Sequence, residues 1–501
     1  VLTTEAPSGT QETFTITYHY NLNDAGGYLA SKQFTGVLWK SIDWKRDANT
    51  GLIRKSCDPS LVCTSYLYDD LGRITTVTPG SSEFATAIRY PSLRKTEVQQ
   101  SADPGTACVP GVDCIYSEYI YDDAARLIET RKRDYADETA AQRTTYDALG
   151  NVRFRSEWSR AQVNPDGSTT PLDLEGNALS EYPRTEYSYI DAISQGLDPF
   201  GRVWKVTTPD GKETETVYRG ADTTVTVKGV QGSGGTFDLT TRYFKDALGR
   251  LVEVSFPDGR YSSGATLPFD AAKAEYAYDT KDNLVGATLI APDGTRQSRA
   301  FAYDGLNRLI REDNPENGTT LYEGYDGLGN LLQKRDSTGN SLSMTYDPAG
   351  RLVKTHNGTV LLSQNIYDQV SEGTNPYGNS AGKLTTAQSY SDVGTLQITQ
   401  RYYYSGLNGR LSGESTIFAE APTTGEFKTQ YAYDNFGLRT RSIHPNEGSG
   451  RLPRDLTATY RNGFQTGLRD TAPGGVTHVA DIQYNPAGSI WKITLPGGAT
   501  D

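Results

Sequence analysis

Four cysteines are the residues whose spacing most restricts the chemistry of this chain. They form two Cys-x5-Cys segments, Cys57 to Cys63 and Cys108 to Cys114, and each segment contains a Pro. We interpret them as two local disulfides, each closing a hairpin loop. The alternative is a four-thiolate zinc site, but its usual signature is paired Cys-x2–4-Cys, which the sequence does not match. Oxidised pairs indicate a secreted or periplasmic setting.

Aspartates are the second group that could do chemistry, because paired carboxylates serve glycosidases and clustered ones bind calcium. Here they recur at one fixed position of a repeated turn, and we interpret them as turn builders. No Asp-x-Asp-x-Asp-Gly loop, His-Glu-x-x-His motif or Gly-x-Ser-x-Gly elbow occurs. The sequence therefore predicts no catalytic residue, cofactor or metal. The predicted turn residues are Asp69, Asp122, Asp147, Asp304, Asp326, Asp347, Asp434, Gly72, Gly150, Gly249, Gly329 and Gly350.

The repeated pattern is Tyr-Asp-x-x-Gly-Arg/Asn-aliphatic, and it recurs from near residue 68 to near residue 490. Asp347-Pro348-Ala349-Gly350 places preferred residues at the first, second and fourth positions of a type I turn. Gly supplies the left-handed conformation that closes a hairpin with a bulge. Ala125 and Asp282 replace it in two copies. Clear copies begin at Tyr68, Tyr121, Tyr146, Tyr278, Tyr303, Tyr325, Tyr346 and Tyr433, degenerate ones at Tyr243, Tyr404 and Tyr484, and stretched ones at Tyr189 and Tyr367.

A second turn joins one copy to the next. Pro-Asp-Gly segments at 165–167, 209–211, 257–259 and 292–294 have the composition of tight turns. The copies at Tyr303, Tyr325, Tyr346 and Tyr367 are 21 or 22 residues apart, which is room for two strands and two turns. The chain is therefore predicted to be a tandem array of β-hairpins, each too small to be stable without its neighbours.

This array resembles the Rhs/YD-repeat family of bacterial secreted proteins, which includes the C components of Tc toxins and the repeat region of teneurins. The resemblance implies an all-β fold in which tandem hairpins form a continuous spiralling sheet that closes into a hollow shell. In several members the shell encloses a toxic C-terminal polypeptide. Some carry an autoproteolytic aspartyl region, but 347–350 matches only its first four residues and is better explained as a turn.

The composition agrees with a β-sheet that is partly exposed to water on both faces. Side chains of the apolar class make up 36% of the chain, and Tyr outnumbers Phe by 33 to 14. The net charge of −12 argues against a nucleic-acid partner, since phosphate binders present basic faces. No stretch of 18 apolar residues occurs, so no membrane span is predicted.

Residues 1–60 are expected to be a degenerate first repeat, which we favour, or an N-terminal plug. Residues 61–501 are expected to form the shell, most regular over 241–360. Because Val1 is not an initiator and 501 directly follows a repeat, we expect a longer natural protein.

We therefore predict a non-enzymatic, secreted or cell-surface scaffold that encloses or displays a C-terminal effector. The alternative is an adhesin whose Tyr-rich face or loops bind surface glycans. The sequence does not specify the oligomeric state.

Overall fold

A computed structural model describes residues 2–5, 11–14, 16–21, 28–34, 40–47, 49–80, 83–102, 108, 113–173, 176–190, 196, 198–232, 235–256, 272–369, 379–405, 409–420, 425–445 and 453–500. Every regular element in these ranges is a β-strand, and none of the described residues belongs to a helix that could cross a membrane. The all-β prediction is confirmed. The Pro-Asp-Gly turn predicted at 257–259 lies outside the described residues.

The strands are short and evenly spaced along the chain. The first group is β1 (Leu2–Glu5), β2 (Gln11–Phe14), β3 (Ile16–Asn21), β4 (Tyr28–Phe34), β5 (Lys40–Arg46), β6 (Ile53–Cys57), β7 (Cys63–Tyr68), β8 (Ile74–Pro79), β9 (Thr86–Ser92), β10 (Lys95–Gln100), β11 (Ile115–Tyr121), β12 (Leu127–Arg133), β13 (Thr139–Tyr146) and β14 (Val152–Ser156). The second is β15 (Ser159–Val163), β16 (Thr169–Leu172), β17 (Arg184–Ser188), β18 (Lys205–Thr207), β19 (Glu213–Arg219), β20 (Asp222–Gly232), β21 (Gly235–Lys245), β22 (Leu251–Phe256), β23 (Ala272–Tyr278), β24 (Leu284–Ile290), β25 (Arg296–Tyr303), β26 (Leu309–Asn314), β27 (Gly318–Tyr322) and β28 (Gln333–Arg335). The third is β29 (Ser341–Tyr346), β30 (Leu352–Asn357), β31 (Val360–Tyr367), β32 (Leu384–Tyr390), β33 (Leu396–Tyr404), β34 (Leu411–Phe418), β35 (Glu426–Tyr433), β36 (Arg439–Ile443), β37 (Asp455–Arg461), β38 (Phe464–Asp470), β39 (Thr477–Val479), β40 (Asp481–Tyr484) and β41 (Ile490–Thr494).

Antiparallel pairing follows chain order. The registers run from β3 to β13, and from β17 to β39, each strand pairing with the one before it. β6 and β7 lie on either side of residue 60 and pair with each other, so the strip is continuous across the boundary that the sequence predicted between 1–60 and 61–501. β1–β2 and β40–β41 are separate two-stranded sheets.

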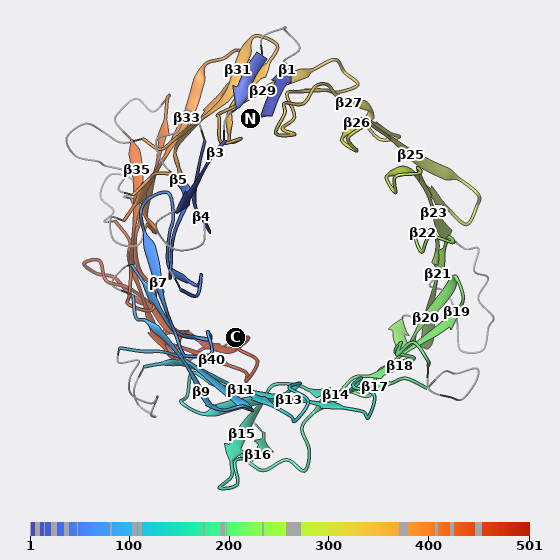
Figure 1. Cartoon of the computed structure of the whole chain (residues 1–501), viewed down its shortest axis with the longest axis vertical. Helices are drawn as coiled ribbons and strands as arrows, with labels where there is room; N and C mark the ends of the chain where they lie inside the picture. The colour runs from blue at the N-terminus through green and yellow to red at the C-terminus, as the bar shows by residue number, and fades with distance from the viewer. Residues whose placement is uncertain are drawn as a thin grey trace.

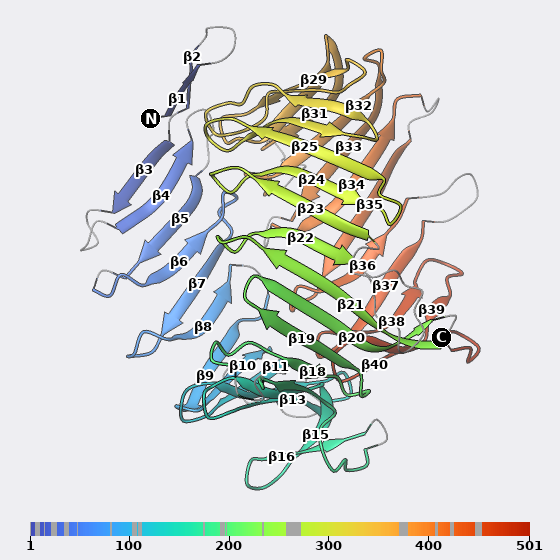
Figure 2. The same ribbon diagram turned by 90° about the vertical axis from the view of Figure 1, so that its right-hand side faces the viewer.

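Among the described strands, the pairing in chain order is interrupted between β13 and β17. β13 pairs with β15 through Ala140 and Ala141, and with β14 through 144–146, while β14 continues to β17. β15 and β16 therefore leave the wall as a hairpin that projects outward from the ring (Figures 1 and 2). A small apolar cluster of Ala141, Ala161 and Tyr182 packs where this hairpin meets β13.

The strip curls into a spiral. Each β-strand twists in the same, right-handed sense, so the twist accumulates along the strip. At most Tyr-Asp turns the register also shifts, as between Thr345 and Tyr346, and the resulting bulge increases the twist. Figure 1 shows a ring in which β3–β9 overlie β33–β40. Figure 2 shows these two groups displaced along the ring axis, so the strip makes one full circuit and begins a second.

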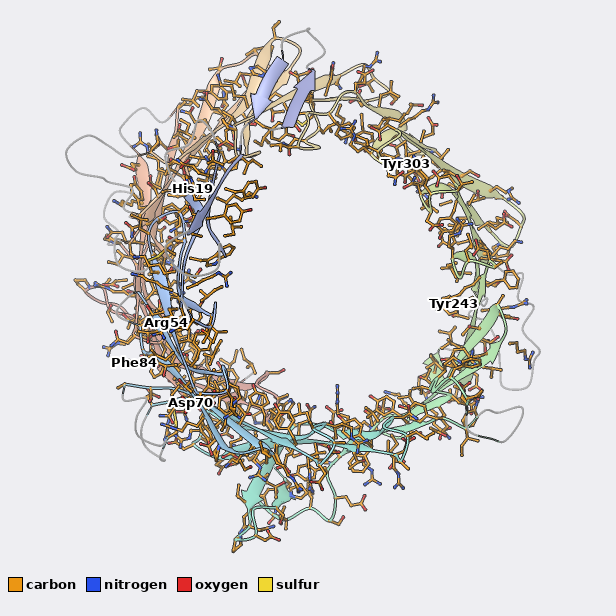
Figure 3. The ribbon with its side chains drawn as sticks, viewed as in Figure 1. His19, Arg54, Asp70, Phe84, Tyr243 and Tyr303 are labelled. Carbon is orange, nitrogen blue, oxygen red and sulfur yellow. A yellow bond between two sulfur atoms is a disulfide. The ribbon has the colours of Figure 1, made fainter. Side chains whose placement is uncertain are left out.

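Few side chains are fully buried in this wall. Apolar residues buried below a tenth exposure include Val254, Ile290 and Ile482. More typical is β31, in which every position is half-buried. The drawn side chains line the ring and leave its centre open (Figure 3). A single-layer sheet between two wet surfaces gives this pattern, because neither face packs against a second layer.

Candidate functional site: the seam between two circuits of the spiral

The Tyr-Asp turn is held by its aspartate. In the turn at Asp69, carboxylate Oδ1 accepts the Leu71 N–H at 3.0 Å and the Arg73 N–H at 2.9 Å. Oδ2 accepts Arg73 Nε at 2.7 Å. These bonds, the backbone bond from Arg73 foremost, lower the pKa of the Asp69 carboxyl. Where Asn replaces Arg, as at Asn330, its Nδ2 donates to the same oxygen at 2.8 Å.

All the predicted turn residues occupy this geometry. In each turn, Oδ1 accepts the backbone N–H four residues later at 2.8–2.9 Å, which holds for Asp69, Asp122, Asp147, Asp304, Asp326, Asp347 and Asp434. The predicted glycines have positive φ of 75–89°, at Gly72, Gly150, Gly249, Gly329 and Gly350. Ala125 and Asp282 take the same conformation (φ 59° and 67°), as does Asn307 (φ 64°), so the turn forms without Gly.

Tyrosine hydroxyls join successive turns, a feature that sequence reasoning missed. The Tyr303 hydroxyl donates to the Leu284 carbonyl, two residues beyond the left-handed position of the preceding copy, at 3.0 Å. The same bond, from a tyrosine hydroxyl to the equivalent carbonyl, is made by Tyr68, Tyr146, Tyr189, Tyr325, Tyr346, Tyr367, Tyr404, Tyr433, Tyr460 and Tyr484. We call this contact the tyrosine clasp.

The arginine of one turn covers the next tyrosine. The guanidinium carbon of Arg351 lies 4.2 Å from the centre of the Tyr367 ring, and that of Arg308 lies 4.6 Å from the Tyr325 ring. Such contacts contribute about 0.5–1 kcal/mol each at exposed sites. The recurrence of Tyr and Arg in the pattern was the available signal for this network, because each copy supplies one partner to its neighbour.

The two circuits meet along what we call the seam. Its first side consists of return turns from the first circuit, at 58–62, 83–84, 113–114 and 134–138. Its second side consists of turns from the second circuit, at 379–383, 409–410, 434–438, 461–463 and 485–488. The partners are more than 300 residues apart in sequence, and no sequence pattern pointed to them.

The first seam contact joins 58–62 to 379–383. Ser60 Oγ donates to the carbonyls of Asn379 at 3.0 Å and Ala381 at 2.8 Å. A Cβ at Gly382 would approach the Pro59 ring to 2.9 Å, so the backbone at Gly382 lies close against that ring. Burial lowers the pKa of the Lys383 amine, which the charge of Asp58 opposes.

The second seam contact is aromatic and ionic. The Phe84 N–H donates to the Asn435 carbonyl at 2.7 Å, and its ring meets Phe436 edge-on with centres 4.9 Å apart. Arg410 Nε donates to Glu83 at 2.6 Å. A cavity of about 490 Å³ lies beside these rings and also touches Leu438.

The third seam contact centres on Asn462, which is 4% exposed. Its backbone N–H donates to Asp113 at 2.9 Å, and its Oδ1 accepts the Cys114 N–H at 3.2 Å. Its Nδ2 donates to the Asp134 carbonyl and to Asp137 at 2.9 and 2.8 Å. Arg461 pairs with Asp137 beside it.

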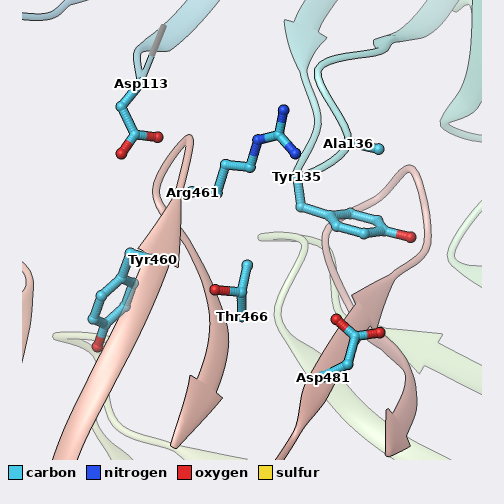
Figure 4. A pocket seen from close by; sticks show the side chains of 7 residues that line it. All are labelled: Asp113, Tyr135, Ala136, Tyr460, Arg461, Thr466 and Asp481. Carbon is cyan, nitrogen blue, oxygen red and sulfur yellow. The ribbon is translucent and has the colours of Figure 1, made fainter. Parts of the chain in front are cut away.

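A cavity of about 780 Å³ opens next to this contact (Figure 4). Asp113, Tyr135, Tyr460, Arg461 and Asp481 line it. Most of these groups already have protein partners, such as Arg439 for the Tyr460 hydroxyl. Within the described residues, no group of three His, Cys, Asp or Glu side chains could hold a metal ion. The arrangement joins two edges of the wall.

The cysteines are bonded as Cys57–Cys63 and Cys108–Cys114. Cys57 and Cys63 flank the seam segment 58–62, and Cys114 belongs to the seam segment 113–114.

Comparison with known proteins gives partial matches in sequence. The RHS Repeat family model matches residues 325–359. Double-stranded DNA deaminase toxin A of Burkholderia cenocepacia (strain H111) is 29% identical over 216 residues, which cover 42% of this chain and 13% of that protein. Probable deoxyribonuclease RhsB of Dickeya dadantii (strain 3937) is 28% identical over 145 residues, covering 24% and 10%. The matched regions are therefore small parts of both relatives.

Solved structures match over almost the whole chain. TcdB2-TccC3 without its hypervariable C-terminal region superposes with a TM-score of 0.63 at 12% identity, covering 97% of this chain and 31% of that one. The TcdB2-TccC3-Cdc42 complex gives a TM-score of 0.62 at 12% identity, with the same coverage. This likeness concerns the fold.

Proposed function

This chain belongs to the Rhs/YD-repeat family, and on that premise we propose that it is a wall segment of a hollow shell that encloses an effector polypeptide. The role of the wall is steric. A continuous strip pairs its own strand edges and separates an interior from proteases and from other chains.

The observation that carries this proposal is the seam. The strip curves through a full circuit and its two ends overlap, with Ser60, Phe84 and Asn462 holding the overlap together. A flat or open array of hairpins would make no such contacts. A wall whose two ends overlap around an open centre is the geometry that enclosure requires (Figure 3).

The wall itself is proposed to be non-enzymatic. The aspartates of the repeat accept backbone and Arg or Asn hydrogen bonds within their own turns, so their oxygens are occupied. The curated relatives are named as a deaminase toxin and a probable deoxyribonuclease, and this chain matches 13% and 10% of them. We propose that any enzymatic activity belongs to the enclosed polypeptide and that this chain forms the shell around it.

The glycan-binding alternative receives less support. The tyrosine clasp engages the hydroxyl of most repeat tyrosines with a backbone carbonyl, and Arg covers the ring of several. Such rings are not free platforms for a sugar. The proposed setting is extracellular or periplasmic, where the two disulfides persist.

Purification of the natural full-length protein without denaturant tests the proposal. Native mass, intact denatured mass and a denaturing gel are compared. A second, cleaved polypeptide of defined mass that leaves the shell only on denaturation is the expected result. A single polypeptide that accounts for the whole mass would exclude an enclosed, cleaved effector.

A further inference from the structure

Both disulfides adjoin the seam: Cys57 and Cys63 flank its segment 58–62, and Cys114 belongs to its segment 113–114 and is bonded to Cys108. The Cys57–Cys63 bond closes the return turn whose Ser60 donates to the carbonyls of Asn379 and Ala381. The Cys108–Cys114 bond ties Cys108 to Cys114, which with Asp113 binds Asn462. Each disulfide therefore holds a loop that contacts the second circuit.

The Cys57–Cys63 disulfide is not needed to form its hairpin. In the first loop, the Asp58 N–H already bonds to the Val62 carbonyl at 2.9 Å, and the Leu61 N–H to the Asp58 carbonyl at 3.0 Å. Return turns away from the seam close in the same way without cysteine. In two of them the Gly167 and Gly294 N–H groups bond to the carbonyls of Asn164 and Ala291 at 2.9 Å. The covalent bonds add rigidity where loops must fit a distant partner.

We propose that Cys57–Cys63 and Cys108–Cys114 are reducible latches of the seam, opened by a dithiol reductant. The proposal rests on the proposed shell function, to which it adds regulation: an oxidising setting keeps the shell closed, and a reducing one loosens it. The observation is the shared location of both bonds at the overlap of the two circuits.

The reaction is thiol–disulfide exchange. Cys63 and Cys108 are half-buried, whereas Cys57 and Cys114 are buried, so we take Cys63 and Cys108 as the sites of attack. A reductant thiolate attacks Sγ of Cys63 or Cys108, the S–S bond breaks, and the bonding electron pair leaves on the sulfur of Cys57 or Cys114, which takes a proton. The second reductant thiolate then attacks the reductant sulfur of the mixed disulfide, which forms the cyclic disulfide of the reductant, and Cys63 or Cys108 leaves as a thiolate that takes a proton. The protein gains two electrons and two protons, and the dithiol becomes a disulfide.

Loss of the covalent bond returns conformational freedom to each loop. Ser60 is then no longer held opposite 379–383, nor Asp113 and Cys114 opposite Asn462. The contact at Phe84 and Phe436 contains no cysteine and is left to hold the overlap with the remaining ionic and polar contacts. Reduction therefore weakens the seam and leaves the hairpins of the wall intact.

Hydrogen exchange followed by mass spectrometry on the full chain tests this, before and after treatment with dithiothreitol. Peptides covering 379–383 and 461–463 report the two latches, and the turn at 246–250, which is away from the seam, is the control. We expect amide exchange at both latch partners to become about tenfold faster or more on reduction, with no change at 246–250. Unchanged exchange at the latch partners after complete reduction would overturn the proposal, as would an equal rise at 246–250, which would indicate general unfolding.

Two paired variants make the test specific. Cys57→Ser with Cys63→Ser should speed exchange at 379–383 only, and Cys108→Ser with Cys114→Ser at 461–463 only, so each controls for the other. If a variant does not fold, chemical reduction of the folded parent remains decisive. Absence of a cargo from the natural protein would remove the enclosure proposal but leave these exchange results standing. If the shell does hold a cargo but amide exchange at 379–383 and 461–463 is unchanged by reduction, only the proposal of reducible latches is excluded.

Discussion

Turns of one design lie in two different surroundings in this molecule. The turn at Asp246, away from the seam, and the turn at Asp434, inside it, both bind the N–H groups two and four residues later at 2.9–3.0 Å. Their third residues differ in environment. Leu248 is 74% exposed, whereas Phe436 packs against Phe84 of the other circuit.

This difference shows that the turn and the seam depend on different sets of interactions. The turn forms from bonds between residues up to four apart, so it does not depend on docking. In the seam, residues at the tip of a turn that is already formed contact the other circuit. Each substitution below disrupts either the bonds within or between neighbouring turns or the contacts of the seam, and leaves the other set in place.

The largest effect is expected at Asn462. Asn462→Ala leaves the buried Cys114 N–H without its partner and removes one of the donors to the Asp134 carbonyl, which costs about 1–3 kcal/mol. It also adds strain, because Asn462 has a φ of 50°. Asn307→Ala is the matched control, since Asn307 also has a positive φ but lies away from the seam. Denaturant unfolding of both variants measures the difference. Equal destabilisation would show that the seam adds nothing at this position.

A smaller loss is expected at the aromatic contact. Phe436→Ala removes the edge-on contact with Phe84 and should cost about 1–2 kcal/mol, since the ring pair and part of the buried area are lost. Leu248 holds the same turn position and is 74% exposed, so Leu248→Ala should change stability by less than about 0.5 kcal/mol. Thermal unfolding compares the two. A similar cost for both would contradict a packed seam.

The tyrosine clasp should be equally strong in both regions, because it joins neighbours along the strip. Tyr303→Phe and Tyr460→Phe each remove a hydroxyl that donates at 3.0 Å to a backbone carbonyl. Each should cost about 1 kcal/mol. Exchange of the neighbouring amides provides the measurement, and a much larger effect at Tyr460 would mean that the seam reinforces the clasp.

The smallest expected effect is the response of single turns to acid. Bonds from Thr338 and Asn340 lower the pKa of Asp336 from 3.8 to about 2. Because the folded-state pKa lies below the unfolded value, this carboxylate stabilises the protein above about pH 4, and the contribution is lost as the pH falls from about 4 to about 2. Asp336→Asn should lose less stability over that interval than the parent. Unfolding midpoints measured at several pH values decide, and parallel curves would exclude the effect.

Much of the fold was readable from the sequence because its determinants are local. The pattern around Asp347 and Gly350 specified a turn, a bulge and two strands. The Cys57 and Cys63 pairing followed from six-residue spacing, and the structure places these residues directly opposite each other in register. Replacement of Gly by Asn307 did not change the geometry, since the bonds to Asp304 are the same.

Other features were not readable. The β15–β16 hairpin leaves the wall because β13 divides its pairing between β14 and β15, and no repeat pattern marks that division. The tyrosine clasp was missed because its acceptor is a backbone carbonyl, which has no side-chain signature. Asn462 was not singled out, since an Asn in a turn is ordinary until its partner is known.

The sequence by itself determined the hairpin: the Tyr-Asp turn, the strands on either side and the disulfide loops, all set by bonds between residues near one another in the chain. Only the tertiary structure decided the seam. Ser60 meets Asn379 and Ala381 because small twists and bulges, added strand by strand through a full circuit, bring the strip back over its own beginning. That accumulated curvature belongs to no single repeat, so the partners of Ser60, Phe84 and Asn462 are fixed by the path of the whole wall.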